Sequence, residues 1–268
     1  MQLLIGFLLA SLISFIAYRL QSLDRSGAFA ATLTGTIIFG MGGWSWAILL
    51  LTFFISSTIL TRSFEGRKNT AGEKFAKGGR RDAGQVFGNG GIAALFVLLH
   101  AIFPAAEWPW LGFAAALAAV NADTWGTELG VLDPHFPRII TDLRKVVEKG
   151  TSGAISVVGT LAAFAGAGSI GVLAASLLPE GFTWSVFWMV SLAGLSGALI
   201  DSLLGATVQV MYHCPSCQKE TERYPAHSCG SRTTKIRGWK WLNNDLVNLA
   251  CGGGGGIVVL VLLAVAAN

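Results

Sequence analysis

The sequence contains few charged residues. Asp, Glu, Lys and Arg make up only 13% of its 268 residues, whereas a soluble globular domain carries roughly 25%. Hydrophobic residues make up 53%, and glycine occupies 34 positions. Such a shortage of charge argues against a water-soluble protein, and many small residues are typical of transmembrane helices that pack closely together. The sequence therefore predicts an all-α, polytopic membrane protein with one membrane domain over residues 1–268.

The first residues lack the basic segment with which a secretory signal peptide begins. We therefore expect the first apolar run to be a retained membrane span. A span takes about 20 apolar residues. By this measure we predict about eight transmembrane helices, at residues 2–18, 26–42, 44–61, 88–104, 108–126, 153–177, 183–210 and 245–266.

Lys and Arg are absent from every second loop. The loops after the second, fourth and sixth predicted spans contain neither residue, whereas residues 19–25, 62–81, 138–149 and 219–240 contain all 19 of them. Because Lys and Arg mark the cytoplasmic side, both termini are expected outside the plasma membrane. Residues 62–87 then form a basic cytoplasmic loop, and residues 211–244 form a second cytoplasmic loop, in which a small zinc-binding hairpin is one candidate structure.

Four acidic residues lie near the predicted cytoplasmic ends of the spans. Asp123 and Glu128 end the fifth span, Asp201 lies late in the seventh, and Asp245 begins the eighth. A carboxylate at membrane depth is costly and is a functional-site hypothesis by default. Oxygen ligands suit Mg²⁺, which keeps waters and substrate phosphates in its shell. We predict that these four residues bind Mg²⁺ and are catalytic; for Asp245, capping of its helix is the alternative.

Two basic, glycine-containing stretches are candidate phosphate sites. In residues 77–85, glycines allow close approach of the backbone and arginines offer bidentate contacts, although membrane topology also explains a basic loop. Lys149 precedes Gly150 and Thr151, which we expect to open the sixth helix as an anion site or a plain cap. A Walker A motif is absent. The predicted substrate-binding residues are Lys77, Arg80, Arg81, Gln85, Asn89, Asn121, Thr124, Lys149, Thr151, Ser152, Asn244 and Asn248.

Cysteine is rare, with four residues in the chain. Thiols on the cytoplasmic side stay reduced, so a Cys-x₂-Cys pair indicates a metal site before a disulfide. Cys214, Cys217, His227 and Cys229 would form a closed tetrahedral zinc site of the structural kind. The alternatives are that His213 replaces one ligand, or that the loop is a polar hairpin without metal.

Five sequence blocks carry a resemblance to a known family. They are residues 78–86 with 89–91, 121–130, 150–154 with 159–160, 201–209, and 242–248. Over nearly its whole length, the chain resembles a family of integral membrane proteins that includes plant phytyl-phosphate kinase and animal transmembrane protein 19. The resemblance implies Mg²⁺-dependent transfer of phosphate from a nucleoside triphosphate, with CTP as one candidate, to an isoprenyl monophosphate. It does not imply zinc.

Two other functions are compatible with membrane-embedded acids. A transporter would use the carboxylates as a proton or cation relay, but it would place polar residues at mid-membrane and on both faces. Another lipid phosphotransferase is the second option, although the D-G-x₂-A-R signature of CDP-alcohol transferases is absent. We expect no nucleic-acid partner. The acceptor lipid, the donor nucleotide and the oligomeric state stay open at this point.

Overall fold

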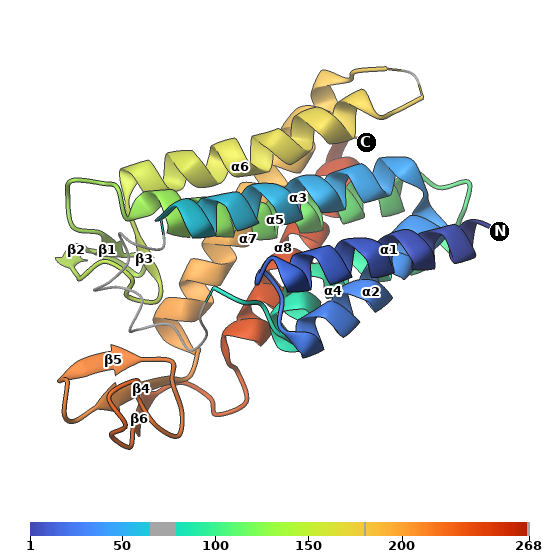
Figure 1. Cartoon of the computed structure of the whole chain (residues 1–268). Helices are drawn as coiled ribbons and strands as arrows, with labels where there is room; N and C mark the ends of the chain where they lie inside the picture. Colours follow the sequence, from blue (N-terminus) through green and yellow to red (C-terminus); the bar gives the residue numbers. More distant parts are fainter. Residues whose placement is uncertain (65–78, 180, 267–268) are drawn as a thin grey trace.

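A computed structural model of the protein describes residues 1–64, 79–179 and 181–266. Over these residues the chain forms eight α-helices, which confirms the predicted number (Figure 1). A short π-helical segment, η1 (Ile38–Gly42), continues α2. The helices are α1 (Gln2–Arg19), α2 (Arg25–Ile37), α3 (Trp44–Phe64), α4 (Ala83–Ile102), α5 (Trp108–Gly130), α6 (Val157–Ser176), α7 (Trp184–Thr207) and α8 (Asn244–Ala266).

Six of the described helices are long and apolar enough to cross a membrane, namely α1, α3, α4, α6, α7 and α8. Helix α2 has only 13 residues. Helix α5 is long but does not meet the same measure of apolarity. Its residues from Phe113 to Ala119 are completely buried, because other helices of the bundle surround it.

Helix α5 packs closely because small side chains cover its middle. Ala114, Ala115 and Ala116 are fully buried. A Cβ added to Gly255 of α8 would lie 2.7 Å from the Ala115 carbonyl oxygen, so α8 can approach α5 this closely only with glycine there. Close approach through small residues is the usual basis of helix association in membranes, where lipid gives no hydrophobic drive between helices.

Two small antiparallel sheets lie at one end of the bundle, and both chain termini lie at the other (Figure 1). The sequence prediction missed the first sheet, because strands of two to five residues leave no clear periodicity. Within residues 211–244 it offered only a small hairpin, and the structure forms a three-stranded sheet there. The first sheet has the order β2-β1-β3 and the second has the order β5-β4-β6. The strands are β1 (Arg138–Ile139), β2 (Asp142–Val146), β3 (Ala154–Ile155), β4 (Met211–Cys214), β5 (Lys219–Thr221) and β6 (Thr234–Arg237).

Several helix ends differ from the predicted spans. Helix α4 begins at Ala83, earlier than expected, because Asp82 and Gln85 form a capping box. Helix α5 continues to Gly130, whereas α7 ends at Thr207. The prediction that the sixth helix opens near Gly153 is wrong. Helix α6 begins at Val157, where the Ser156 Oγ atom accepts a hydrogen bond of 3.1 Å from a backbone N–H.

The segment before α6 is a tight loop instead of a helix end. Gly150 and Gly153 have φ angles of +80° and +79°, a left-handed conformation that favours glycine. A Cβ on Gly153 would lie 2.3 Å from the Ala206 backbone nitrogen. This loop therefore packs directly on the last turn of α7, and glycine is required for both its backbone angle and its contact.

We predict that Gly153→Ala lowers the thermal unfolding midpoint of the purified protein by more than Gly181→Ala does. Both glycines have positive φ, so each variant loses roughly 1–2 kcal/mol through backbone strain. Only Gly153 has atoms within contact distance of an added Cβ. Equal midpoints for the two variants in the same detergent would contradict the described packing.

Candidate functional site

A polar cavity of about 1020 Å³ lies at the end of the bundle that carries the sheets. Its lining comes from α3 to α8, together with the segment before α4, the loop before α6 and residues in and near the second sheet. All four predicted carboxylates line this polar cavity, from three different helices: Asp123, Glu128, Asp201 and Asp245. The convergence of helix ends expected from the charge pattern is therefore present in the fold.

The carboxylates form a concentrated negative site. Asp201 interacts electrostatically with Asp123, and both interact with Glu222. Like charges this close repel, so a cation between them would lower their energy. The Asp201 Oδ2 atom is buried and has no hydrogen-bond partner among the described residues. An oxygen-rich, acidic donor set of this kind fits a hard cation such as Mg²⁺.

Glu222 was missed at the level of sequence. Glu222 directly follows β5, in a loop. The local sequence does not indicate that this loop folds back to the helix ends, where Glu222 lines the cavity. Ser202, Gln209 and Tyr212 also line the cavity and were not predicted. Their positions depend on how the second sheet folds against α7, which no local pattern shows.

Glu128 lies inside a helix, since α5 continues to Gly130. The residue is only 5% exposed. Its Oε1 atom accepts a hydrogen bond of 2.8 Å from the Thr61 hydroxyl of α3. Glu128 also attracts the guanidinium of Arg81. The residue is thus fixed between α3 and the basic loop, and it is not a helix cap.

Arg81 is held in place from several directions. Its guanidinium donates to Ser57 Oγ at 2.9 Å and to Thr58 Oγ1 at 3.3 Å. The guanidinium also lies 5.5 Å from the centre of the Phe54 ring. Its backbone N–H donates to the Ser22 carbonyl at 2.9 Å. Burial lowers the pKa of Arg81 to about 10, while Glu128 opposes this shift, so the side chain stays charged at neutral pH.

Asp245 lies in the first turn of α8. The side chain that caps this turn is Asn243, whose Oδ1 atom accepts a hydrogen bond of 3.1 Å from Leu246 N–H. A Cβ on Gly88 of α4 would lie 2.6 Å from the Asp245 carbonyl oxygen, so α4 and α8 touch at this point. The tight contact places the start of α8 against the polar cavity.

Most of the predicted polar residues also line the polar cavity. They come from the segment before α4, from α4 and α5, from the loop before α6, and from α8; they are Arg81, Gln85, Asn89, Thr124, Lys149, Thr151, Ser152, Asn244 and Asn248. Arg80 is exposed and does not line the cavity. Lys77 lies outside the described residues. The side chains of Asn89 and Asn248 make no hydrogen bond to another described residue, so their amides are available to a ligand.

Asn121 has a different role from the predicted one. It is completely buried and does not line the polar cavity. Its Nδ2 atom donates to the Gly166 carbonyl at 2.8 Å, and its Oδ1 atom accepts from Ser56 Oγ at 3.1 Å. Asn121 therefore joins α5 to α6 and α3, as polar residues do between membrane helices.

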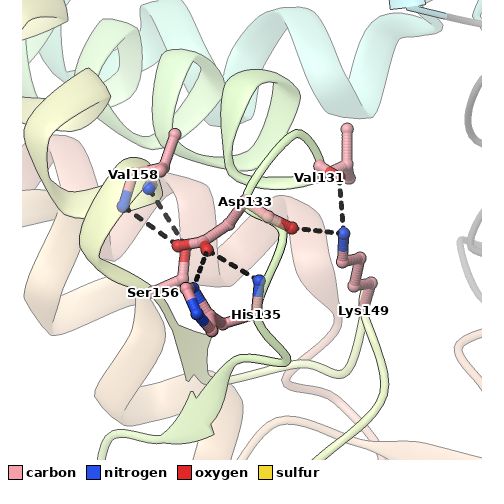
Figure 2. A network of polar contacts seen from close by, with 7 residues as sticks. Val131, Asp133, His135, Lys149, Ser156 and Val158 are labelled. Carbon is pink, nitrogen blue, oxygen red and sulfur yellow. Dashed lines mark hydrogen bonds and ion pairs between the residues drawn. The ribbon is translucent and has the colours of Figure 1, made fainter.

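Lys149 is bonded to the backbone of the protein itself. Its ammonium donates to the backbone carbonyls of Val131 at 2.9 Å and of Asp133 at 2.5 Å, as Figure 2 shows. Both carbonyls follow the C-terminal end of α5, where a cation is favourable. The lysine thus fixes the chain that leaves α5, and its role as a phosphate ligand stays a prediction, since it also lines the polar cavity.

The Asp133 carboxylate joins the same turn to the start of α6 (Figure 2). It accepts hydrogen bonds from His135 N–H at 3.0 Å and from Val158 N–H at 3.2 Å. These two bonds hold the pKa of Asp133 below its ordinary value. The network positions the loop before α6, which forms one wall of the polar cavity.

A second hollow, the apolar groove, lies among α1, α2, α3 and α4 and has a volume of about 210 Å³. Along α3 it extends from Trp44 to Phe54, which corresponds to roughly 15 Å at 1.5 Å per residue. Three residues line both the apolar groove and the polar cavity: Arg81, Gln85 and Asn89. The two hollows therefore meet at these side chains.

The four predicted zinc ligands also lie together. The ligand atoms of Cys214, Cys217, His227 and Cys229 are all within 4.8 Å of one another. His213 lies on β4, but it is not one of this group among the described residues. The cluster is separate from the carboxylates.

We predict that Asp133→Asn lowers the thermal unfolding midpoint at neutral pH. The difference in midpoint between the variant and the wild type should narrow below about pH 4. The pKa of Asp133 is lower in the folded protein. The ionised Asp133 carboxylate therefore contributes its full stabilisation at pH values above the pKa that this group has in the unfolded chain. That contribution is lost as the pH falls through the lower pKa that the group has in the folded protein. Thermal unfolding of both proteins across this pH range measures the effect, and a constant difference would contradict it.

Comparison with known proteins identifies relatives over most of the chain. The family model "Integral membrane protein DUF92" matches residues 8–255. The chain is 35% identical over 271 residues to "Protein PGR" of Arabidopsis thaliana, covering 92% of this chain and 91% of the relative. It is 34% identical over 206 residues to an uncharacterized membrane protein of Methanocaldococcus jannaschii, covering 76% of this chain and 82% of the relative.

A further relative is "Protein VTE6, chloroplastic" of Arabidopsis thaliana, which is 28% identical over 234 residues, covering 85% of this chain and 61% of the relative. No solved structure matches the chain. The resemblance indicated by the five sequence blocks is confirmed at the level of the family. The chain therefore belongs to the family of integral membrane proteins described as DUF92.

Proposed function

We propose that this protein is a Mg²⁺-dependent kinase that transfers a phosphate from a nucleoside triphosphate, with CTP as one candidate, to an isoprenyl monophosphate. The observation that carries the proposal is the meeting of the polar cavity and the apolar groove at Arg81. A lipid phosphate has the same two parts, a charged head and an apolar chain. The family resemblance stated from the sequence blocks supports the same reaction.

The acceptor lipid would place its chain in the apolar groove and its phosphate at Arg81. A guanidinium makes strong, charge-assisted bonds to phosphate oxygens, and the contacts with Ser57 and Phe54 hold this one in a fixed orientation. The groove length of roughly 15 Å is half of the ~30 Å hydrocarbon core. The groove thus suits the first part of a chain that continues within one leaflet.

The nucleotide would occupy the polar cavity. The cavity volume of about 1020 Å³ is at the upper end of the range for ordinary ligand pockets, roughly 300–1,000 Å³. An oxygen of the lipid phosphate attacks the γ-phosphorus of the nucleotide. A new P–O bond forms as the bond from that phosphorus to the β–γ bridging oxygen breaks, and the nucleoside diphosphate leaves. The attacking oxygen is already anionic, so no general base is required.

The residues of this chain would contribute positioning and charge neutralisation, which account for most of the catalysis in phosphoryl transfer. Asp123, Glu128, Asp201 and Asp245 would hold Mg²⁺, which when bound neutralises charge on the phosphate oxygens. Arg81 would hold the acceptor phosphate. Gln85, Asn89, Asn244 and Asn248 would orient the two substrates through amide hydrogen bonds.

We place this end of the bundle on the cytoplasmic side of the cell membrane, with both termini outside. The proposal is supported by the loops rich in Lys and Arg, which follow α1, α3, α5 and α7. Positive loops face the cytoplasm, where nucleoside triphosphates are available. The apolar ends of the same helices would then face away from the nucleotide.

The reaction is tested with purified protein in detergent, labelled CTP, ATP or GTP, and phytyl, geranylgeranyl or farnesyl monophosphate. We expect a lipid diphosphate from at least one pair, and its loss when EDTA removes Mg²⁺. Asp123→Asn and Asp201→Asn should each lower kcat by roughly 10²-fold or more, since each removes a charged ligand of the Mg²⁺ that would neutralise the phosphate oxygens.

The matched control for these variants is Asp142→Asn, at an exposed position in β2 at the same end of the molecule. It should retain wild-type kcat. If no nucleotide and lipid pair yields a diphosphate, the kinase proposal fails. If both cavity variants keep near-normal activity, the assignment of Mg²⁺ to these carboxylates fails.

The apolar groove gives a separate prediction about chain length. Leu9 lines the groove, whereas the neighbouring Leu8 is 58% exposed on the outer surface of α1. Leu9→Trp should lower kcat/KM by about tenfold for a long-chain monophosphate, equal to about 1.4 kcal/mol, because the indole occupies space needed by the chain. Leu8→Trp should leave it unchanged. An equal effect of both variants would show that the chain binds elsewhere.

A further inference from the structure

The second sheet carries four metal-binding side chains that the proposed kinase chemistry does not use. The Cys214 and Cys229 Sγ atoms are 3.5 Å apart. The His227 Nδ1 atom lies 3.5 Å from the Cys217 Sγ atom and 3.4 Å from that of Cys229. All four ligand atoms lie within 4.8 Å of one another. They form a compact set of three sulfurs and one nitrogen.

Two turns bring these residues together. Cys214 ends β4, and Cys217 lies in the turn to β5, which closes through a bond of 2.9 Å from Gln218 N–H to the Cys214 carbonyl. In the second turn, the Gly230 N–H donates to the His227 carbonyl at 2.9 Å. Cys214 is completely buried and His227 is 4% exposed. Cys217 is half-buried and Cys229 is exposed, so the cluster is buried on the side of Cys214 and His227 and reaches the surface at Cys229.

We infer that Cys214, Cys217, His227 and Cys229 bind one structural zinc ion. Zinc lies about 2.3 Å from sulfur and about 2.0 Å from nitrogen, so tetrahedral ligand atoms lie roughly 3.3–3.8 Å apart. The three separations of 3.4 to 3.5 Å match this spacing. The set leaves no open position, so the ion serves the fold and takes no substrate. The inference does not rest on the proposed kinase function.

The second sheet is small, and Arg237 of β6 joins it to the end of α7 through a bond of 2.8 Å to the Gly205 carbonyl. Its strands have four, three and four residues. Segments below about 40 residues usually need a metal, disulfides or a partner to fold. All four cysteines of the chain are free. A metal ion at the ligand cluster would stabilise the folded form of the second sheet, as it does in other small metal-binding units.

The zinc site would fix one wall of the polar cavity. Tyr212, Glu222 and Ser228 lie near the ligands in sequence and line the cavity. Gln209 Nε2 donates to Glu222 at 2.9 Å, and its Oε1 atom accepts from the Ser152 hydroxyl at 2.8 Å. This chain of bonds joins the sheet to the loop before α6. Zinc would thus hold Glu222 near Asp123 and Asp201.

The test is elemental analysis of protein purified with reduced thiols and without chelator. We expect about one zinc ion per chain, and near-complete loss of zinc in Cys217→Ser and in Cys229→Ser. The controls His213→Ala and Cys251→Ser should retain it, because neither residue belongs to the cluster. The inference would be overturned if the wild-type protein held less than about half an equivalent of zinc after zinc was supplied. It would also be overturned if the two cysteine variants kept a full equivalent of zinc.

A second measurement covers variants that fail to fold. Wild-type protein is stripped of metal and titrated with Co²⁺, which should give the intense thiolate bands of a tetrahedral sulfur-rich site. The stripped protein should also be cleaved faster by trypsin at Lys219, Arg223 and Arg232 of this segment, and added zinc should restore protection. A stripped protein that is kept reduced and still binds no Co²⁺ would refute the site.

Discussion

The high cost of placing charge in hydrocarbon is the constraint on which this structure depends. The carboxylates of α5, α7 and α8 all lie around one polar cavity at one end of the bundle. They repel one another there, as the interactions among Asp123, Asp201 and Glu222 show. The chain itself provides one compensating cation, Arg81, whose guanidinium attracts the Glu128 carboxylate.

The same helix forms both the core and the site. The first part of α5 is lined with alanine and lets the surrounding helices approach closely. Asn121 then joins α5 to α3 and α6 through hydrogen bonds. Asp123 and Glu128 follow within two turns. Rigid packing of the first part of α5 therefore sets the positions of the Asp123 and Glu128 carboxylates in its second part. A functional site requires its side chains to be held in fixed positions in this way.

Sequence patterns predicted the membrane helices and the acidic residues well, because both depend on strong, local properties. Runs of about 20 apolar residues and rare charges within them are visible without any knowledge of tertiary contacts. The boundaries were less accurate where capping decided them, as at Asp82 and Ser156. The first small sheet was missed, and only a hairpin was offered where the second forms, since the strands are too short to show alternation.

Residue roles were harder to predict than residue positions. Lys149 and Asn121 looked like substrate ligands, but their hydrogen bonds go to the protein itself. Conversely, Glu222 reaches the cavity only because the second sheet folds back over the helix ends. The apolar groove is formed by four helices, and no single segment of sequence indicates it.

The sequence by itself determined that the chain is a membrane helix bundle and which residue types are too costly to be incidental. Hydropathy and charge are properties of the residues, so they can be read one segment at a time. Only the tertiary structure decided which polar groups face the polar cavity, and that this cavity meets the apolar groove at Arg81. The reason is physical: a side chain's hydrogen-bond partners come from distant segments, and only packing brings those segments together.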